Sequence, residues 1–240
     1  MKILTFLPLL FVLFACQQTD DSKNINANAK VDSNTPITTH KKINSPIAAP
    51  NNFSVMVDQP YDIVESDEAC TEPVVIEFFA YQCPHCYTLE KHAEKWKSKN
   101  AGKVKFQSVP THLGHKEFGV FLIVHQAAKN LNLLDKAIPM LFKRLHEDKK
   151  GFSSPEEAIA FLVSIGANEE AAKKAIEDDK AIKVGMDENF RLLAQYKIAG
   201  VPTILVNHRY QFDVTKAGGY DKVFEVVEET LKLPSSCPDK

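Results

Sequence analysis

The chain lacks an excess of charge of either sign. Its 240 residues include 29 lysines and arginines against 31 aspartates and glutamates, which gives a net charge of -2, and its isoelectric point is about 6.5. Tight binding to nucleic acid usually needs a broad basic surface that contacts many phosphates. We therefore expect no nucleic-acid partner.

Long hydrophobic runs are also missing. The apolar stretch Ile3–Phe14 is too short to span a bilayer as a helix, but it has the length of an export signal. It ends in Leu13-Phe14-Ala15-Cys16, which resembles the lipobox of bacterial lipoproteins, where the cysteine carries the lipid. Residues 1–16 are therefore predicted to be a lipoprotein signal peptide with Cys16 as the lipidation site. The alternative is an ordinary secretory signal with an unrelated cysteine.

Residues 17–60 are poor in aromatic residues and rich in Asn, Thr, Ser, Asp and Lys. Such a segment cannot bury enough apolar surface to offset the entropy lost on ordering. We interpret it as a flexible polar tether with a reach on the order of 35 Å, not as a dimerisation arm, and we expect a monomer. Gln17, directly after the lipobox, favours anchoring to the outer membrane, which would leave the folded domain in the periplasm.

Cysteine is scarce, and two of the five cysteines lie close together in Cys83-Pro84-His85-Cys86. The preceding residues Val74–Ala80 form the nearly unbroken apolar run of a buried strand. The helical spacing of an apolar face follows, at Leu89, Ala93 and Trp96. Cys83 is therefore predicted where a central strand leads into a helix, with Pro84 at the first helical position. Two cysteines so spaced at the start of a helix favour a redox pair.

The other patterns predict an α/β chain with a helical block in the middle. Tyr61–Glu65 and Val104–Val109 suit strands, whereas residues 113–196 show almost only helical signals. Within that block, Ser154-Pro155-Glu156-Glu157 predicts a capped helix start, and Asn168 predicts the next cap. Further helical faces are Ile138, Leu141, Phe142 and Leu145, and Met186, Phe190 and Leu193. After the block we expect strands at Thr203–Val206 and Arg209–Asp213, a turn at Asn207-His208, and a last helix with Val223, Phe224, Val227 and Leu231 on one side.

Together these motifs resemble the DsbA family of periplasmic thiol:disulfide oxidoreductases, which has a thioredoxin fold with an inserted all-helical domain. The resemblance rests on Glu77-Phe78-Phe79, on Cys83-Pro84-His85-Cys86-Tyr87, and on Gly200-Val201-Pro202 directly before a strand. The last of these corresponds to the family's cis-proline loop. The implied domains are a thioredoxin-like domain at 61–112 and 197–240, and an inserted helical domain at 113–196.

The predicted chemistry depends on a difference between the two cysteines. At the N-terminus of a helix, Cys83 gains from unpaired N–H groups and the helix dipole, and His85 adds a donor or a positive charge. A stabilised thiolate favours the reduced form, which makes the disulfide a good donor. Cys86, one turn further along the helix, is predicted to be buried, with a higher pKa. No separate cofactor is expected, because the disulfide itself is the redox group.

Two further features complete the predicted site. Glu77 is expected beneath the motif, where it accepts or relays a proton; the alternative is a solvent-facing strand residue. The family lysine that pairs with such an acid would align near Ser108, so either Lys105 substitutes or Glu77 is tuned differently. Pro202 is predicted to be cis, which places Gly200 and Val201 beside the sulfurs, where an extended peptide adds as a strand. The alternative is an ordinary strand start.

The remaining cysteines and histidines receive simpler interpretations. An exported protein favours a structural disulfide between Cys70 and Cys237, with two independent thiols as the alternative. His125 lies in an apolar helical stretch and is interpreted as a core residue, not a ligand. His112 and His115 border a loop and are expected to be solvated.

These features predict an oxidase that donates the Cys83–Cys86 disulfide to reduced or unfolded exported proteins. The resemblance implies re-oxidation by a quinone-linked membrane partner similar to DsbB. One alternative is a disulfide isomerase or reductase on the same fold. Another is a module that binds metal through Cys83, His85 and Cys86, but the sequence has no second ligand cluster at a suitable spacing, so no metal site is predicted.

Overall fold

The computed structural model describes residues 59–68 and 70–235. The predicted signal peptide with Cys16, nearly all of the tether, and Cys237 lie outside the described residues. Within the described part, no helix is both long enough and apolar enough to cross a membrane.

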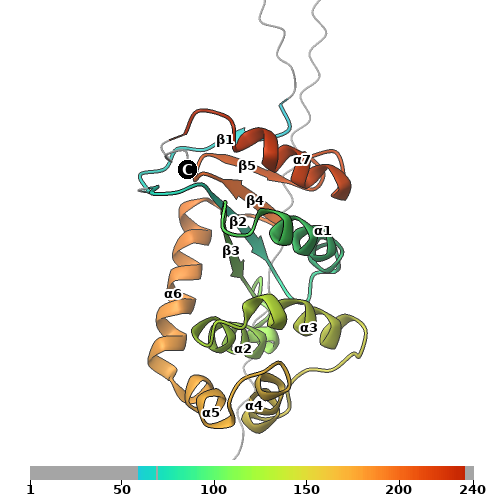
Figure 1. The fold of residues 1–240 in the computed structure, drawn as a ribbon, viewed down its shortest axis with the longest axis vertical. Coiled ribbons are helices and arrows are strands. Elements are labelled where there is room, and N and C mark those ends of the chain that lie inside the picture. The colour runs from blue at the N-terminus through green and yellow to red at the C-terminus, as the bar shows by residue number, and fades with distance from the viewer. Residues whose placement is uncertain (1–58, 69, 236–240) are drawn as a thin grey trace, which may run out of the picture. The chain divides into compact units, whose positions relative to one another are not determined.

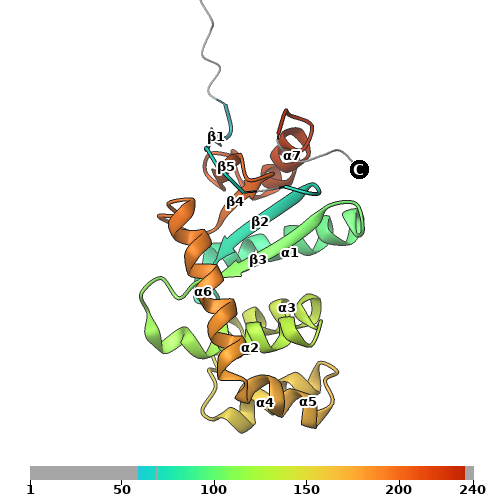
Figure 2. The same cartoon turned by 90° about the vertical axis from the view of Figure 1, so that its left-hand side faces the viewer.

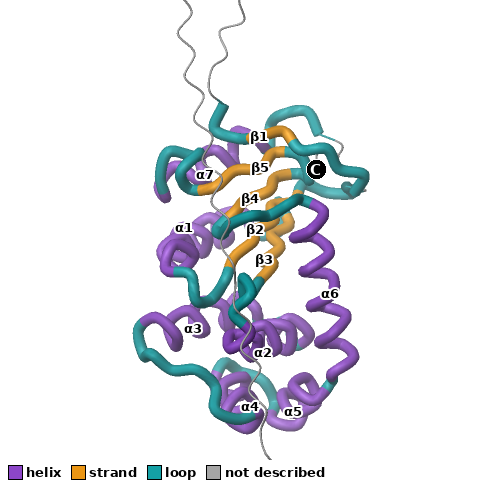
Figure 3. The backbone as a smooth tube through the Cα atoms, turned by 180° about the vertical axis from the view of Figure 1, so that it is seen from behind, coloured by secondary structure: helices purple, strands orange, loops and turns teal. Residues whose placement is uncertain are grey.

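Among the described residues, five strands form one mixed sheet in the order β1-β5-β4-β2-β3 (Figure 3). Their bounds are β1 Asp62–Ile63, β2 Val74–Phe79, β3 Lys105–Pro110, β4 Thr203–Val206 and β5 Tyr210–Asp213. β2 pairs parallel with β3 and antiparallel with β4, and β5 pairs antiparallel with both β4 and β1. β2 is thus an interior strand, and all six of its residues are buried. This explains why its sequence is apolar almost throughout.

The strands match the predicted ones in kind but differ at their ends. The first predicted strand shrinks to two paired residues, although the Val64 N–H still donates to the Arg209 carbonyl at 2.8 Å. Arg209 belongs to the turn and not to β5, because its N–H donates to the Val206 carbonyl at 3.0 Å. Asn207 and His208 close this turn with left-handed φ values of 50° and 56°, a backbone conformation that asparagine adopts more readily than most residues.

In the part of the chain that the structure describes, seven α-helices accompany the sheet. Their bounds are α1 Pro84–Asn100, α2 Gly119–Asn130, α3 Leu134–His146, α4 Pro155–Ser164, α5 Glu169–Glu177, α6 Asp179–Gln195 and α7 Tyr220–Thr230. Figure 1 shows α1 and α7 beside the sheet on one side and α6 on the other, and Figure 2 shows α6 running along the sheet toward the other helices. The predicted order, a strand–helix–strand unit and a strand–strand–helix unit separated by helices, is confirmed.

Alternation along β2 sends its side chains to different layers. Val75 joins a core formed with residues of α1 and α7. Ile76 and Phe78 instead pack with Leu192 of α6. Residues of odd number in β2 therefore point toward the helix that begins at Cys83, which decides where Glu77 lies.

Helices α2 to α5 form a second layered group beyond β3, with α4 and α5 farther from the sheet than α2 and α3 (Figures 1 and 3). The two predicted caps of this group are confirmed. Ser154 Oγ accepts the Glu157 N–H at 3.4 Å, and Asn168 Oδ1 accepts the Ala171 N–H at 3.2 Å. The Glu157 carboxylate, however, accepts the N–H of Ser153, one residue before the position that a capping box would use.

The predicted apolar face of α6 differs from the buried one. Phe190 is 38% exposed, whereas Ile182, Asn189 and Leu192 are buried. Phe190 lies edge-on to His112, with ring centroids 5.7 Å apart. Its apolar surface therefore covers part of the loop that follows β3 instead of filling the core.

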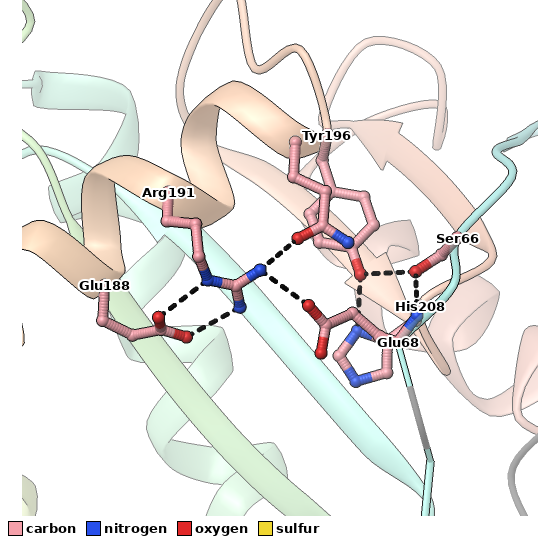
Figure 4. A network of polar contacts seen from close by, with 7 residues as sticks. Ser66, Glu68, Glu188, Arg191, Tyr196 and His208 are labelled. Atoms are coloured by element: carbon pink, nitrogen blue, oxygen red, sulfur yellow. Dashed lines mark hydrogen bonds and ion pairs between the residues drawn. The ribbon is translucent and has the colours of Figure 1, made fainter.

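The segment before β2 is held to α6 by Arg191 (Figure 4). Its guanidinium makes two hydrogen bonds to Glu188, both 2.8 Å, and one to Glu68 at 2.7 Å. It also donates to the Gln195 side chain at 2.6 Å. Because the side chains are partly exposed, we assign these contacts to positioning and not to stability.

A second set of contacts continues from the end of α6 to the β4–β5 turn (Figure 4). The Tyr196 hydroxyl lies 2.9 Å from Ser66 Oγ and 2.7 Å from His208 Nδ1. The chain that enters β2, the last turn of α6 and the β4–β5 turn are thus joined at one end of the sheet.

Candidate active site

Cys83 is the N-cap of α1 and lies between the buried strand β2 and the helix, as predicted. Its backbone is extended (φ -81°, ψ 117°), Pro84 starts the helix, and the Cys83 sulfur accepts the Cys86 N–H at 3.4 Å. No acidic residue lies in the first turn of α1. The partial positive charge at this helix end is therefore not offset by a first-turn carboxylate and stabilises the sulfur as an anion.

This environment lowers the pKa of the Cys83 thiol from 9.0 to about 6. The largest cause is the hydrogen bond from the Cys86 side chain, and partial burial opposes it by raising the pKa. The backbone N–H groups of Cys86 and His85 and the charge of His85 lower it further. At neutral pH the thiolate is therefore the main form of Cys83.

Cys86 has the opposite character. Its side chain is fully buried, and burial is the largest cause of a pKa raised far above that of an ordinary thiol. Both cysteines are free thiols in this structure. One thiol is therefore accessible and acidic, and the other is buried and stays protonated, as the sequence predicted for this pair.

The loop before β4 faces the sulfur of Cys83. The Val201–Pro202 peptide bond is cis, as predicted, and the Cys83 thiol donates to the Val201 carbonyl at 3.6 Å. Thr203 Oγ1 donates to the Gly200 carbonyl at 2.8 Å and so braces the loop. His85, Gly200, Val201 and Pro202 line one side of a groove of about 550 Å³ that continues along β5. An extended peptide in this groove would meet the loop backbone next to Cys83.

Glu77 is buried, with 2% of its surface exposed, so it does not face solvent. It points toward α1, where a second buried acid, Glu90, lies one turn after Cys86. Burial, and then the like charge of Glu90, raises the pKa of Glu77, while Lys97 acts against this shift. Burial also raises the pKa of Glu90, although Lys97 donates to it at 3.1 Å. The two carboxyls therefore hold protons at pH values where exposed ones are ionised.

The lysine beside the two buried acids, Glu77 and Glu90, comes from a different element than the sequence suggested. Ser108 does lie opposite Glu77 in the β2–β3 register, but Lys105 lies opposite Val74 and is exposed. The lysine whose charge lowers the pKa of Glu77 is instead Lys97, from the last turn of α1. Sequence reasoning missed both Glu90 and Lys97. Their spacing of seven residues, each directly after a residue of the buried face, is the signal that could have found them.

The loop between β2 and α1 is attached to the helical insertion through Tyr81. The Tyr81 hydroxyl lies 2.8 Å from Nδ1 of His125, and His146 Nε2 donates to the Tyr81 carbonyl at 2.7 Å. His125 is buried, and burial lowers its pKa to about 3, so it is a neutral core residue, as interpreted from sequence. The inserted helices therefore help to fix the chain two residues before Cys83.

His85 is exposed, and its ring contacts a residue that sequence reasoning also missed. Nδ1 of His85 lies 2.6 Å from the hydroxyl of Tyr220, the first residue of α7. No periodic pattern marks Tyr220 as a partner of the cysteine motif, because the two segments lie far apart in the sequence.

The other predicted groups lie away from the sulfurs. His115 is exposed beside Glu117, and His112 is partly buried, with its carbonyl accepting from Gln82. Cys70 is disulfide-bonded; its partner lies outside the described residues, so the pairing with Cys237 stays a prediction. Within residues 59–68 and 70–235, no group of three or more Cys, His, Asp or Glu side chains is arranged to hold a metal ion.

A helix that begins at an acidic thiol, a buried second thiol and a facing cis-proline loop define the site of a thiol:disulfide oxidoreductase. Comparison with known proteins leads to the same class. Residues 74–227 match the family model of the DSBA-like thioredoxin domain. The chain therefore belongs to the DsbA-like family, has the thioredoxin fold with inserted helices, and is a protein disulfide oxidoreductase.

Relatives and solved structures give the same result. The chain is 33% identical to the thiol:disulfide interchange protein DsbA of Azotobacter vinelandii over 166 residues, which cover 68% of this chain and 75% of that protein. Identity to the Pseudomonas aeruginosa protein of the same name is 32% over 169 residues, 69% of this chain and 74% of that one. The crystal structure of Pseudomonas aeruginosa DsbA superimposes with a TM-score of 0.64 at 26% identity, covering 72% of this chain and 91% of that chain.

Proposed function

We propose that the protein is an oxidase that donates the Cys83–Cys86 disulfide to newly exported proteins in the periplasm. The observation that carries this proposal is the difference between the two thiols, with the pKa of Cys83 lowered to about 6 and that of the buried Cys86 raised. Exchange proceeds in the direction that releases the more stable thiolate. Because the reduced form is favoured by its Cys83 thiolate, the oxidised form transfers its disulfide readily.

The proposed reaction has two exchange steps. A client thiolate attacks the Cys83 sulfur of the Cys83–Cys86 disulfide, a mixed disulfide forms, and Cys86 leaves as a thiolate that takes a proton. A second client thiolate then attacks the client sulfur of the mixed disulfide, and Cys83 leaves as a stable thiolate. The client loses two electrons and gains a disulfide, the cysteine pair gains those two electrons, and no separate cofactor takes part.

The surrounding residues receive roles in the same scheme. Glu77, buried beneath α1, is the proposed source of the proton that Cys86 takes as it leaves. His85 and Pro84 shape the end of the helix at which Cys83 ionises. Gly200, Val201 and Pro202 offer backbone groups to an extended client, which suits clients of many sequences, because main-chain hydrogen bonds do not depend on side chains.

The cellular setting is inferred from sequence and family resemblance. Residues 1–16 supply the proposed lipoprotein signal, with Cys16 as the lipid anchor to the outer membrane, and residues 17–60 supply the tether. The monomeric domain comprises the predicted thioredoxin-like part, 61–112 and 197–240, and the helical insertion, 113–196. A quinone-linked membrane partner similar to DsbB would re-oxidise Cys83 and Cys86.

A trapping experiment tests this proposal. Oxidised wild-type protein is mixed with a reduced client that has several cysteines. In parallel, Cys86→Ser loaded as a mixed disulfide with glutathione is mixed with a variant of the client that keeps a single cysteine, so that no second client thiol can release Cys83. We expect rapid client oxidation by the wild type, non-native pairings included, and an accumulating Cys83–client disulfide with Cys86→Ser. Cys83→Ser is the control that forms neither.

The redox potential of the Cys83–Cys86 pair in a glutathione buffer series decides between the oxidase and its alternative on the same fold. A potential well above that of thioredoxin, about -270 mV, is expected for an oxidase. A potential as reducing as that value, with selective reshuffling of wrong disulfides, would establish an isomerase or reductase.

A further inference from the structure

Tyr220 is the strongest unexplained feature beside the cysteine pair. Two glycines, Gly218 and Gly219, have left-handed φ values of 87° and 123° and form the turn that starts α7 at Tyr220. This turn places the Tyr220 side chain in the groove next to His85, and both residues line that groove. Glycine suits the turn because other residues rarely adopt such φ values.

Two histidines of α1 hold the Tyr220 ring between them. His85 and His92 lie seven residues apart, which is two helical turns, and therefore on the same side of α1. Their rings are nearly parallel to the Tyr220 ring, with interplanar angles of 19° and 22° and centroids 6.4 Å and 6.3 Å away. Nδ1 of His92 also lies 3.6 Å from the carboxylate of Asp221. The position of Tyr220 is thus defined from both sides.

The polar contact of Tyr220 is with the histidine of the redox motif. Its hydroxyl lies 2.6 Å from Nδ1 of His85. Among the described residues, this is the hydrogen bond that the His85 ring makes, and none runs from that ring to the Cys83 sulfur. The sulfur is instead held by the Cys86 N–H and faces the Val201 carbonyl.

We propose that Tyr220 is a positioning residue for the redox pair: by occupying Nδ1 of His85, it holds the imidazole against α7 and keeps it from donating to the Cys83 sulfur. Without the hydroxyl, Nδ1 has no partner, and the nearest anion in sequence is the thiolate two residues earlier. A hydrogen bond from a ring N–H to a thiolate is charge-assisted and stabilises the anion. Tyr220 therefore limits the oxidising power of the pair. This inference rests on the proposed oxidase function.

The test is Tyr220→Phe, which keeps the stacked ring and removes only the hydroxyl. The Cys83 thiolate is titrated in the reduced protein by its ultraviolet absorbance, and the redox potential is measured in glutathione buffers. We expect the acid dissociation constant of Cys83 to rise at least about threefold, and the potential to become more oxidising by about 14 mV, the value to which a threefold change converts at 29.6 mV per tenfold. An unchanged or weaker acidity of Cys83 overturns the proposal.

Two controls separate positioning from a general structural role. Lys222→Gln changes a nearby exposed side chain of α7 that pairs with Glu225 and should leave both readouts unchanged. In a His85→Leu background, Tyr220→Phe should also have no effect, because the double-mutant cycle then lacks the residue through which Tyr220 acts. A shift that persists without His85 contradicts the proposed route.

The outcomes distinguish this inference from the function on which it rests. A wild-type protein with an unperturbed Cys83 and no disulfide transfer would overturn the oxidase function itself. A wild-type protein that transfers disulfides with an acidic Cys83, but is insensitive to Tyr220→Phe, would overturn the role of Tyr220 alone.

Discussion

Helix α1 carries ionisable groups at two levels, and the protein treats charge in opposite ways at them. At its first turn, Cys83 is partly exposed and its pKa is lowered to about 6. Further along, Glu90 and the facing Glu77 are buried, and their pKa values are raised. The thiol end thus favours an anion, whereas the buried layer favours neutral acids.

The difference shows what each environment provides. The helix end offers free N–H groups aimed at the sulfur, and water still reaches it, so the cost of charge is small. The buried layer offers one cation, Lys97, to two carboxylates, and desolvation dominates. This arrangement suits the proposed reaction. Cys83 leaves as a stable thiolate near the surface, and Cys86 leaves as a thiolate that takes a proton from the protonated acids beneath it.

The largest effect should come from removing the cation of the buried layer. Lys97→Met leaves Glu77 and Glu90 without a counter-charge, and the exposed fractions of the Lys97 and Glu90 side chains are only 15% and 5%. We expect the free energy of unfolding to fall by about 3 kcal/mol at pH 8, and by much less at pH 5, where the acids are already protonated. Urea unfolding at the two pH values measures this.

Lys99→Met is the matched control for that prediction, because Lys99 is exposed in the same helical turn. It should change stability by no more than about 0.5 kcal/mol at either pH. Equal losses at pH 5 and pH 8 for Lys97→Met would mean that Lys97 matters through packing, for example over the Phe106 ring, and not through its charge.

The second-largest effect is the contribution of Cys83 to the free energy of unfolding. This contribution grows as pH rises, whereas that of the buried acids falls. The folded pKa of Cys83, about 6, lies below the value of 9.0 for a free thiol, so between these values the folded reduced protein binds fewer protons than the unfolded chain. Its stability should therefore rise from pH 6 to pH 9 and be lost as pH falls through 6. The full shift corresponds to about 4 kcal/mol, which we discount to about 2 kcal/mol because Cys83 is half exposed.

This rise is measured as the difference between the reduced wild type and Cys83→Ser in denaturant unfolding at several pH values. Taking the difference removes the contributions of Glu77 and Glu90. Their raised pKa values act in the other direction, since stability is lost as pH rises from the ordinary carboxyl range through the raised values. A flat difference curve would show that Cys83 ionises like a free thiol.

The smallest effect is expected when one of the two acids is neutralised. Glu90→Gln removes the like charge beside Glu77 and keeps an oxygen that can accept from Lys97. The pKa of Glu77 should fall, and the protein should gain about 1 kcal/mol at pH 8 but nothing at pH 4, where both acids are protonated. Thermal unfolding at the two pH values measures the gain. Glu229→Gln, an exposed acid of α7, serves as control; a gain of similar size there would point to general charge reduction.

Local patterns were sufficient for much of the fold and part of the site. The apolar run of β2, the caps at Ser154 and Asn168, and the position of Cys83 depend on neighbouring residues, and each was predictable. The ends of the strands were less predictable, because a strand ends where the hydrogen bonds to its partner strand end. The face of α6 was misjudged because Phe190 covers a loop instead of the core.

The groups that tune the site were hidden for a different reason. Lys97 of α1 lowers the pKa of Glu77 in β2, whereas the family pattern predicts a lysine in β3. Tyr220 meets His85 only because α7 lies beside α1. Such pairs have no fixed spacing in sequence, so no local pattern reports them.

The order of residues alone determined that an acidic thiol begins a helix after a buried strand, because helix caps, apolar periodicity and the cysteine spacing are local properties of the chain. Tertiary structure decided how strongly that thiol and its surroundings are tuned. Burial, the number of cations near two acids, and the partner of the His85 ring arise only when distant segments pack together, and electrostatic energies depend on those distances and on exclusion of water.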